Sequence, residues 1–191
     1  MIDKKYKIIL ASNSPRRQEL ISGIDIEYEI RVINDIDESY PDDIASEDVA
    51  EFLAIKKANS YHDKIKDNEL LITADTVVLK GDEVLGKPED KLDAQIMLNK
   101  LSDTTHLVIT GVCIYTTSKQ VSFSNITKVT FGKLSDDEIE YYIDTYKPYD
   151  KAGAYGIQEW IGFVGVKHIE GSYFNVMGLP IYRIYDELKK F

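Results

Sequence analysis

Short apolar runs typical of strands alternate along this 191-residue chain with longer segments that have the caps and periodicity of helices. The strand-like runs cover residues 6–11, 27–33, 69–74, 77–79, 84–85, 107–116, 121–131 and 161–169, and the helical segments cover residues 15–22, 46–62, 91–101, 135–146 and 180–190. Two long β-rich runs are joined only by Thr117-Ser118-Lys119-Gln120, which predicts an antiparallel pair. Alternation combined with such pairing predicts an α/β fold with a mixed central sheet flanked by helices, in one domain over residues 1–191.

Local signals define several ends of these elements. Ser46 is expected to cap the helix over residues 46–62. Ser135 and Glu138 form a capping box, in which the serine bonds an amide of the first turn and the glutamate bonds back. Asp75 directly follows the strand over residues 69–74, and ligands bind at the carboxyl ends of strands in α/β proteins.

The composition limits the classes of partner. A formal net charge of −10 and an isoelectric point near 4.8 argue against nucleic acid, because its binding needs a broad basic surface, whereas a small polyanion needs only a local basic cluster. The single cysteine, Cys113, is expected to be a core residue in a reducing cytoplasm, and the scattered histidines form no zinc motif. No apolar run is long enough for a membrane span or a signal peptide, so we expect a cytoplasmic protein that does not enter membranes.

The most unusual local feature is the sequence SNSPRR at residues 12–17, which opens the first helix. Ser14 can be the N-cap, with a proline at the first helical position. Arg16 and Arg17 then lie in the first turn, where positive charge opposes the helix dipole. A bound anion explains this placement, since backbone N–H groups, the hydroxyls of Ser12 and Ser14 and two guanidinium groups form a phosphate site. A solvated helix start, with the arginines paired to surface acids, is the equally weighted alternative.

Five further side chains could act on a phosphate or a nucleotide, and each has a plain structural alternative. They are Glu38, Lys57, Asp75, Lys87 and Gln158. Glu38 could lie on a solvated acidic surface, and Lys57 could be a cation favoured by the C-terminus of its helix. Asp75 could cap a turn, Lys87 could be an ordinary exposed lysine, and Gln158 could belong to an ordinary glycine-rich loop. Neither a GxxxxGK[ST] nor a GxGxxG pattern occurs, so the sequence does not support a P-loop or a Rossmann nucleotide site.

Taken in order along the chain, these segments resemble the Maf family of nucleoside triphosphate pyrophosphatases over essentially its whole length. The matching segments are Ala11-Ser12 to Arg16-Arg17 with Glu19-Leu20, Leu53-Ala54 with Lys57-Ala58, Ala74-Asp75-Thr76, Gly86-Lys87-Pro88, His106 with Ile109-Thr110, Asp150 to Gln158, and Gly171-Ser172-Tyr173 with Val176 to Pro180. A single match would be modest evidence, but this ordered set is highly specific.

The resemblance implies hydrolysis of a nucleoside triphosphate to the monophosphate and pyrophosphate with a divalent cation, Mg²⁺ or Mn²⁺. It implies two lobes around a cleft that holds the site, similar to the inosine triphosphate pyrophosphatases. By this resemblance Asp75 is the catalytic acid and a metal ligand, with Glu38 as its acidic partner. The implied substrate-binding residues are Ser12, Ser14, Arg16, Arg17, Lys57, Thr76, Lys87 and Gln158.

Within the family, Arg16, Thr76 and Gln158 match the subgroup that acts on dTTP and UTP, and a second subgroup acts on 7-methyl-GTP. That second activity and a non-catalytic nucleotide-binding regulator of cell division are the alternatives. Glu159-Trp160 departs from the family pattern, in which glycine is commoner after the glutamine, and Lys147 stands where an acid is expected. Both departures bear on base preference. A homodimer is an option that the resemblance raises, although no exposed apolar stripe demonstrates it.

Overall fold

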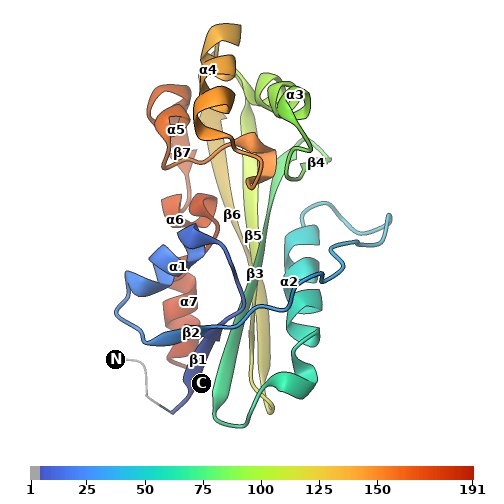
Figure 1. Ribbon diagram of the computed structural model, residues 1–191, viewed down its shortest axis with the longest axis vertical. Coiled ribbons are helices and arrows are strands. Elements are labelled where there is room, and N and C mark those ends of the chain that lie inside the picture. The colour runs from blue at the N-terminus through green and yellow to red at the C-terminus, as the bar shows by residue number, and fades with distance from the viewer. Residues whose placement is uncertain (1–4) are drawn as a thin grey trace. The chain divides into compact units, whose positions relative to one another are not determined.

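The computed structural model describes residues 5–191, and within them seven strands form one sheet (Figure 1). The strands are β1 (Lys7–Leu10), β2 (Tyr28–Ile30), β3 (Glu69–Lys80), β4 (Glu83–Leu85), β5 (Thr105–Tyr115), β6 (Gln120–Phe131) and β7 (Val166–Glu170). Their order is β2-β1-β3-β5-β6-β7, with β4 paired to β3. Because β1 is parallel to β2 and β3 whereas β3–β4 and β6–β7 are antiparallel, the expectation of a mixed sheet is confirmed.

Seven α-helices and two short 3-10 helices connect these strands within the described residues. The helices are α1 (Pro15–Ser22), α2 (Val49–Asn59), η1 (His62–Lys64), α3 (Lys91–Leu101), α4 (Asp136–Tyr146), η2 (Ala152–Ala154), α5 (Trp160–Gly165), α6 (Tyr173–Met177) and α7 (Ile181–Leu188). None of the helices in this part of the chain is long and apolar enough to cross a membrane.

The chain folds into two compact units, each made of several chain segments. The first unit contains the described residues up to Asp75 together with Thr110–Asn125 and Gly178–Phe191. The second unit contains Thr76–Ile109 and Ile126–Met177. The three longest strands, β3, β5 and β6, contribute residues to both units.

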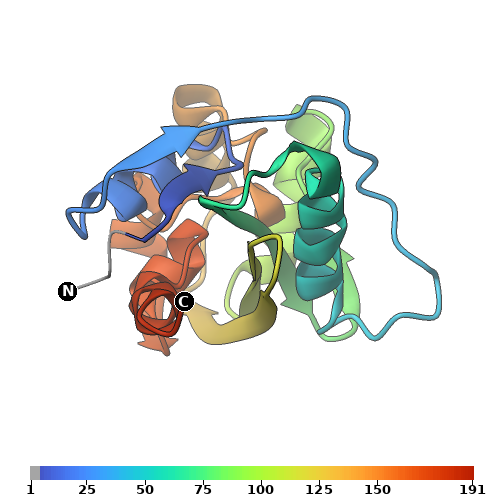
Figure 2. The same cartoon turned by 90° about the horizontal axis from the view of Figure 1, so that it is seen from below.

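The core of the first unit lies between its strands and α2. Ile9, Leu71 and Cys113 from three strands pack with Ala54 and other apolar residues of α2, so Cys113 is a core residue as expected. The helix lies directly against β5 at a glycine, because a Cβ atom on Gly111 would come within 2.3 Å of the backbone of α2. Figure 2 shows α2 and α7 on opposite sides of these strands, which confirms that helices flank the sheet.

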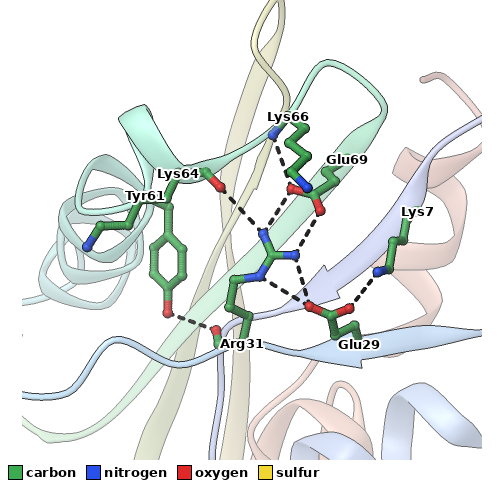
Figure 3. Close-up of polar contacts among 7 residues, drawn as sticks. All are labelled: Lys7, Glu29, Arg31, Tyr61, Lys64, Lys66 and Glu69. Carbon is green, nitrogen blue, oxygen red and sulfur yellow. Dashed lines mark hydrogen bonds and ion pairs between the residues drawn. The ribbon is translucent and has the colours of Figure 1, made fainter.

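A polar network centred on Arg31 joins β1, β2 and β3 in the first unit (Figure 3). The guanidinium donates to both carboxylate oxygens of Glu69, at 2.9 and 2.8 Å, and to Glu29 at 3.2 and 2.9 Å. Lys7 pairs with the second oxygen of Glu29 at 2.5 Å, and the Tyr61 hydroxyl donates to the carbonyl of Arg31 at 2.9 Å. The bidentate contact with Arg31 lowers the pKa of Glu69 to about 2, so this buried carboxylate stays ionised near neutral pH.

The second unit is built around the β3–β4 hairpin and the helix pair α3–α4. The capping box is confirmed, since Ser135 accepts from the Glu138 amide at 3.3 Å while the Glu138 carboxylate accepts from the Ser135 amide at 2.7 Å. Asp90 caps α3 in the same way, with its side chain accepting from the Asp93 amide at 2.9 Å. Both helices therefore begin where short-range chemistry places them.

Two predicted elements of the first unit are wrong in extent. The strand expected over residues 27–33 covers only Tyr28–Ile30, because the amide of Ile33 donates to the hydroxyl of Tyr61 and not to a neighbouring strand. The helix expected over residues 46–62 begins at Val49, with Asp48 and not Ser46 at the N-cap position, and ends at Asn59.

The strand expected to stop before Asp75 continues to Lys80, so Asp75 lies within β3. On one edge the strand changes partner, with parallel pairing to β1 up to Ile72 and antiparallel pairing to β4 from Val78, and its other neighbour in the sheet is β5. Such a change of partner depends on tertiary structure and leaves no local sequence signal.

The strand expected over residues 161–169 is wrong in its first half, which forms α5, and only Val166–Glu170 is a strand. Short apolar runs do not distinguish a buried strand from a helix. Here the chain turns tightly, since a Cβ atom on Gly162 would lie 1.8 Å from the carbonyl oxygen of Ile157. The helix buries Ile161 and Gly165, which are one turn apart. Helix α6 is not anticipated by the sequence patterns.

Candidate functional site

The first group of site residues lies where β1 and β3 stop pairing. The parallel ladder ends at Leu10 and Ile72, and the Ala11 amide then donates to the carbonyl of Ile72 at 3.0 Å. Beyond this point β1 leads into the segment before α1, while β3 continues to Asp75. Asp75 therefore lies just beyond the carboxyl end of the parallel part of β3, where ligands bind in α/β proteins.

The start of α1 agrees with the sequence prediction in its backbone and differs in its side-chain contacts. Ser14 is the N-cap residue and Pro15 occupies the first turn, but the Ser14 hydroxyl makes no capping hydrogen bond. The amide of Ser14 donates to the hydroxyl oxygen of Ser12 at 3.2 Å, and Ser12 is buried. No acidic residue lies in this first turn, which holds the half-buried Arg16.

Arg17 is an anchor for the backbone beside Asp75. Its Nε donates to the carbonyl of Gly178 at 2.7 Å, and its Nη1 donates to the carbonyl of Ala74 at 2.9 Å. Burial lowers the pKa of the Arg17 guanidinium, and the negative charges of Asp75 and Glu38 act in the opposite direction. The guanidinium therefore holds the residue that precedes Asp75.

Lys57 brings the two acidic side chains together. Its ammonium group contacts Asp75 Oδ1 in a short ion pair and Glu38 Oε1 at 2.9 Å. The side chains of Lys57 and Asp75 are each 15% exposed, whereas that of Glu38 is 49% exposed. Lys57 lies in the last turn of α2, so its ammonium group faces two carboxylates, one from β3 and one from the segment that carries Glu38.

The acidic segment around Glu38 is fixed on both sides. Ile36 packs against the core of the first unit. On the other side, Lys56 donates to Asp37 at 2.8 Å and to the carbonyl of Ser39 at 2.7 Å. Because Lys56 and Lys57 are adjacent in α2, one helix end holds Asp37 and Glu38 through successive side chains.

A divalent cation can be tested against the donor groups of this cluster. Asp75 and Glu38 offer carboxylate oxygens, the ligands that Mg²⁺ and Mn²⁺ prefer, and both already contact one positive charge on Lys57. No group of three or more His, Cys, Asp or Glu side chains among residues 5–191 could hold a metal by itself. The residues fit a cation whose remaining ligands are phosphate oxygens and water, as is usual for Mg²⁺.

The second unit joins the loops that carry Lys87 and Gln158. The amide of Gly153 donates to the carbonyl of Gly86 at 3.0 Å, and a Cβ atom on Gly153, whose φ is +67°, would lie 2.9 Å from the side chain of Val78. The positive φ and the close contact both require glycine. The segment over residues 150–158 is therefore packed directly on β3 and on the loop that carries Lys87.

The Gln158 side chain lies over Gly156 with part of its hydrogen-bonding capacity unused. A Cβ atom on Gly156 would come within 2.8 Å of Gln158 Nε2, so the glycine makes room for the amide. Gln158 Oε1 is buried without a hydrogen-bond partner in the structure. A buried acceptor of this kind is costly unless a ligand satisfies it.

A buried histidine supports the same segment. His106 Nε2 and the Tyr155 hydroxyl are joined by a hydrogen bond of 2.8 Å, and the rings of His106, Tyr155 and Phe131 meet edge to face. Burial, with the charge of Lys80, lowers the pKa of His106 from 6.5 to about 4. His106 is therefore neutral in the folded protein at neutral pH.

We expect the free energy of unfolding to fall by about 3 kcal/mol as the pH is lowered from 7 to 4, because the unfolded chain binds a proton that folded His106 excludes. The depressed folded pKa means that this stability is complete above pH 6.5 and lost toward pH 4. Urea unfolding over this range measures it. His106→Gln should remove this slope and His62→Gln, at an exposed histidine, should keep it; an unchanged slope in His106→Gln contradicts the prediction.

The ten residues singled out from the sequence fall into two groups. The first unit holds Ser12, Ser14, Arg16, Arg17, Glu38, Lys57 and Asp75, and the second holds Thr76, Lys87 and Gln158. Contacts join Ser12 to Ser14, and Lys57 to Asp75 and Glu38. That both groups form a single site stays a prediction.

Sequence reasoning missed Tyr142, and it treated Glu159 only as a departure from the family pattern. The two side chains hydrogen-bond to each other beside Gln158. Tyr142 lies 17 positions earlier on α4, so no spacing rule connects it with that segment.

Comparisons with known proteins agree with these observations. The family model described as Maf-like protein matches residues 7–191. A protein of Parabacteroides distasonis named dTTP/UTP pyrophosphatase is 60% identical, over 98% of this chain and 97% of that protein. A protein of Bacteroides thetaiotaomicron with the same name is 54% identical, over 97% of this chain and 96% of that protein. The solved structure of the Staphylococcus aureus Ham1 protein has a TM-score of 0.54 at 17% identity, covering 95% of this chain and 99% of that one. This last likeness confirms the expected fold and nothing further.

Proposed function

We propose that this chain, which belongs to the Maf family, hydrolyses dTTP and UTP to the nucleoside monophosphate and pyrophosphate. The observation that carries the proposal is the contact of Lys57 with Asp75 and Glu38, beside an α-helix that has two arginines in its first turn. Acids and cations in this arrangement serve hydrolysis of a phosphoanhydride, because the reaction needs both a proton acceptor and neutralised phosphates.

In the proposed reaction a water oxygen attacks the α-phosphorus, and the bond from the α-phosphorus to the bridging oxygen of the leaving pyrophosphate breaks. Asp75 orients the water and accepts its proton. Lys57, held 15% exposed against Asp75, places a positive charge next to that carboxylate. Arg16 and the Ser12 and Ser14 hydroxyls bind phosphate oxygens at the start of α1.

Arg17 acts in two ways in this proposal. Its bonds to the carbonyls of Ala74 and Gly178 fix the backbone next to Asp75, and its charge attracts the phosphates. Lys87 adds a further cation from the second unit. A bound Mg²⁺ or Mn²⁺ ion, held by Asp75 and Glu38, would neutralise phosphate charge and lower the pKa of a coordinated water.

We assign the base preference to Gln158 and Thr76, which belong to the same unit. Uracil and thymine present an N3–H donor between two carbonyl oxygens, whereas cytosine has no hydrogen at N3. The buried acceptor Oε1 of Gln158 can take the N3–H bond, and its Nε2 can donate to a neighbouring carbonyl. A site built to bind a donor rejects a base that lacks it, because the acceptor is then left unpaired.

The proposal is tested by incubating the protein with a panel of nucleoside triphosphates and Mg²⁺ or Mn²⁺ and measuring released pyrophosphate. We expect the highest kcat/KM with dTTP and UTP, and no release after chelation of the metal. Preference for 7-methyl-GTP would contradict the substrate assignment. Nucleotide binding without pyrophosphate release would favour a regulator over an enzyme.

Replacement of Gln158 or Arg16 by alanine should weaken discrimination among bases. For Gln158→Ala we expect the UTP over CTP ratio of kcat/KM to fall roughly tenfold to hundredfold, since one good hydrogen-bond pair is lost. Arg16→Ala should weaken discrimination as well and also raise KM. Steady-state kinetics with both nucleotides measure the effect, and unchanged selectivity in both variants contradicts a role in recognition.

A further inference from the structure

Resting on the proposed function, we propose that Glu159 is a positioning residue for base selection, and that Tyr142 and Lys151 hold it in place beside Gln158. We call these three side chains the Glu159 clamp. Its members come from α4 and from the two ends of the segment over residues 150–159, all within the second unit.

The clamp is a continuous chain of hydrogen bonds that starts at the backbone beneath Gln158. The amide of Gly156 donates to the Tyr142 hydroxyl at 2.9 Å, and that hydroxyl donates to Glu159 Oε2 in a short bond. Burial and the Glu159 carboxylate raise the pKa of Tyr142, so the phenol keeps the proton that it donates. Tyr142 thus links a backbone amide to a carboxylate three residues further on.

Lys151 closes the clamp from the other end of the segment. Its ammonium contacts Glu159 Oε1 at 3.1 Å and Asp150 Oδ1 at 2.8 Å. The side chains of Lys151 and Glu159 are 8% and 19% exposed, so the ion pair is shielded from water and from salt. Both carboxylate oxygens of Glu159 are therefore engaged, which fixes the orientation of its side chain.

Glu159 and Gln158 share one packing surface, which is the backbone of Gly156. A Cβ atom on Gly156 would lie 2.8 Å from Gln158 Nε2 and 2.9 Å from Glu159 Cδ. The amide of Glu159 also donates to the carbonyl of Gly156 at 3.0 Å. A shift of the Glu159 carboxylate therefore moves the turn over which the Gln158 amide lies.

The clamp is expected to act on selectivity more than on bond breaking. None of its members belongs to the first unit, which holds Asp75, Lys57 and the start of α1. A displacement of the Gln158 amide of about 1 Å is enough to degrade a directional hydrogen bond, and such misplacement costs up to about a hundredfold in rate terms. Loss of the clamp should thus raise KM for the preferred base selectively.

The test compares Glu159→Gln and Tyr142→Phe with Glu140→Gln, a matched change on α4 that removes an exposed charge paired with Lys91. For both clamp variants we expect the UTP over CTP ratio of kcat/KM to fall roughly tenfold, mainly through KM for UTP, while Glu140→Gln keeps the wild-type ratio. In the double variant the UTP over CTP ratio should fall little further than in either single variant, because both substitutions break the same network. Thermal unfolding confirms that each variant is folded.

An unchanged ratio in folded Glu159→Gln and Tyr142→Phe overturns the inference, and so does an equal loss of kcat with both nucleotides. Binding of non-hydrolysable uridine and cytidine triphosphate analogues separates this failure from failure of the proposed function. If the wild-type protein releases no pyrophosphate yet prefers the uridine analogue, the catalytic proposal fails and the clamp is judged on binding alone. If the wild-type protein shows no such preference, the clamp has no selectivity to set and the inference is wrong.

Discussion

Asp75→Asn is expected to lower kcat for pyrophosphate release by roughly 10²- to 10⁴-fold while the protein stays folded. Asparagine keeps the shape of the side chain but accepts no proton from water and carries no charge toward a cation. Lys57 retains Glu38 as an ionic partner at 2.9 Å, so the substitution leaves no cation without a partner. Steady-state release of pyrophosphate from dTTP or UTP, with saturating Mg²⁺, measures the loss.

The matched control for this variant is Asp37→Asn. Asp37 lies next to Glu38 and pairs with Lys56, the neighbour of Lys57, but its side chain is 69% exposed. We expect its kcat to stay within a few-fold of the wild-type value. Near-normal turnover by Asp75→Asn would show that the proton acceptor is another group, and a comparable loss in Asp37→Asn would point to a general effect of charge.

Arg31→Met is expected to lower the free energy of unfolding by about 3 kcal/mol at pH 7. The substitution leaves Glu69, whose side chain is 3% exposed, as a buried carboxylate without its bidentate partner. The difference in unfolding free energy between the variant and the wild-type protein should become smaller at acid pH. In the wild-type protein the depressed Glu69 pKa of about 2 gives stability that is complete above pH 4.5 and lost as the pH falls toward 2. Urea unfolding at several pH values measures both effects.

Two further variants separate the buried pair from surface charge. Lys7→Met removes the cation that pairs with exposed Glu29, and we expect a change below about 1 kcal/mol. The double variant Arg31→Met/Glu69→Leu should recover most of the stability, because no buried charge is then left alone. A loss below about 0.5 kcal/mol in Arg31→Met would mean that Glu69 finds water or another partner.

The parts of the fold that short-range chemistry determines could be predicted from the sequence. Helices α1 and α3 have the predicted bounds, because a serine–proline start and an Asp90 cap mark their first residues. The capping box of α4 follows the same rule. In contrast, the length of β3 depends on which strands lie beside it, and α5 depends on a glycine that lets its first turn pack against Ile157. The pairing of β3 is not visible in a local window, and the short apolar run at α5 does not distinguish a helix from a strand.

The same division applies to the candidate site. Residue types and family resemblance indicated Asp75, Lys57 and Glu38, and the structure brings these three into contact. The sequence did not indicate that Arg17 bonds to backbone carbonyls, because those bonds span 57 and 161 residues of chain. It also gave no reason to connect Tyr142 with Glu159, since a hydrogen bond between a helix and a distant loop has no sequence period.

The bonds of Arg17 change how variants of the arginine doublet should be interpreted. Adjacent residues of one type invite the view that each contributes an equal share of positive charge. Arg17 instead donates from two nitrogens of its planar guanidinium to two backbone carbonyls, and lysine does not have this fixed fork of donors. Truncation at position 17 therefore removes two backbone contacts together with a positive charge. A double-alanine variant would therefore not separate the lost charge of the doublet from the lost support of the backbone beside Asp75.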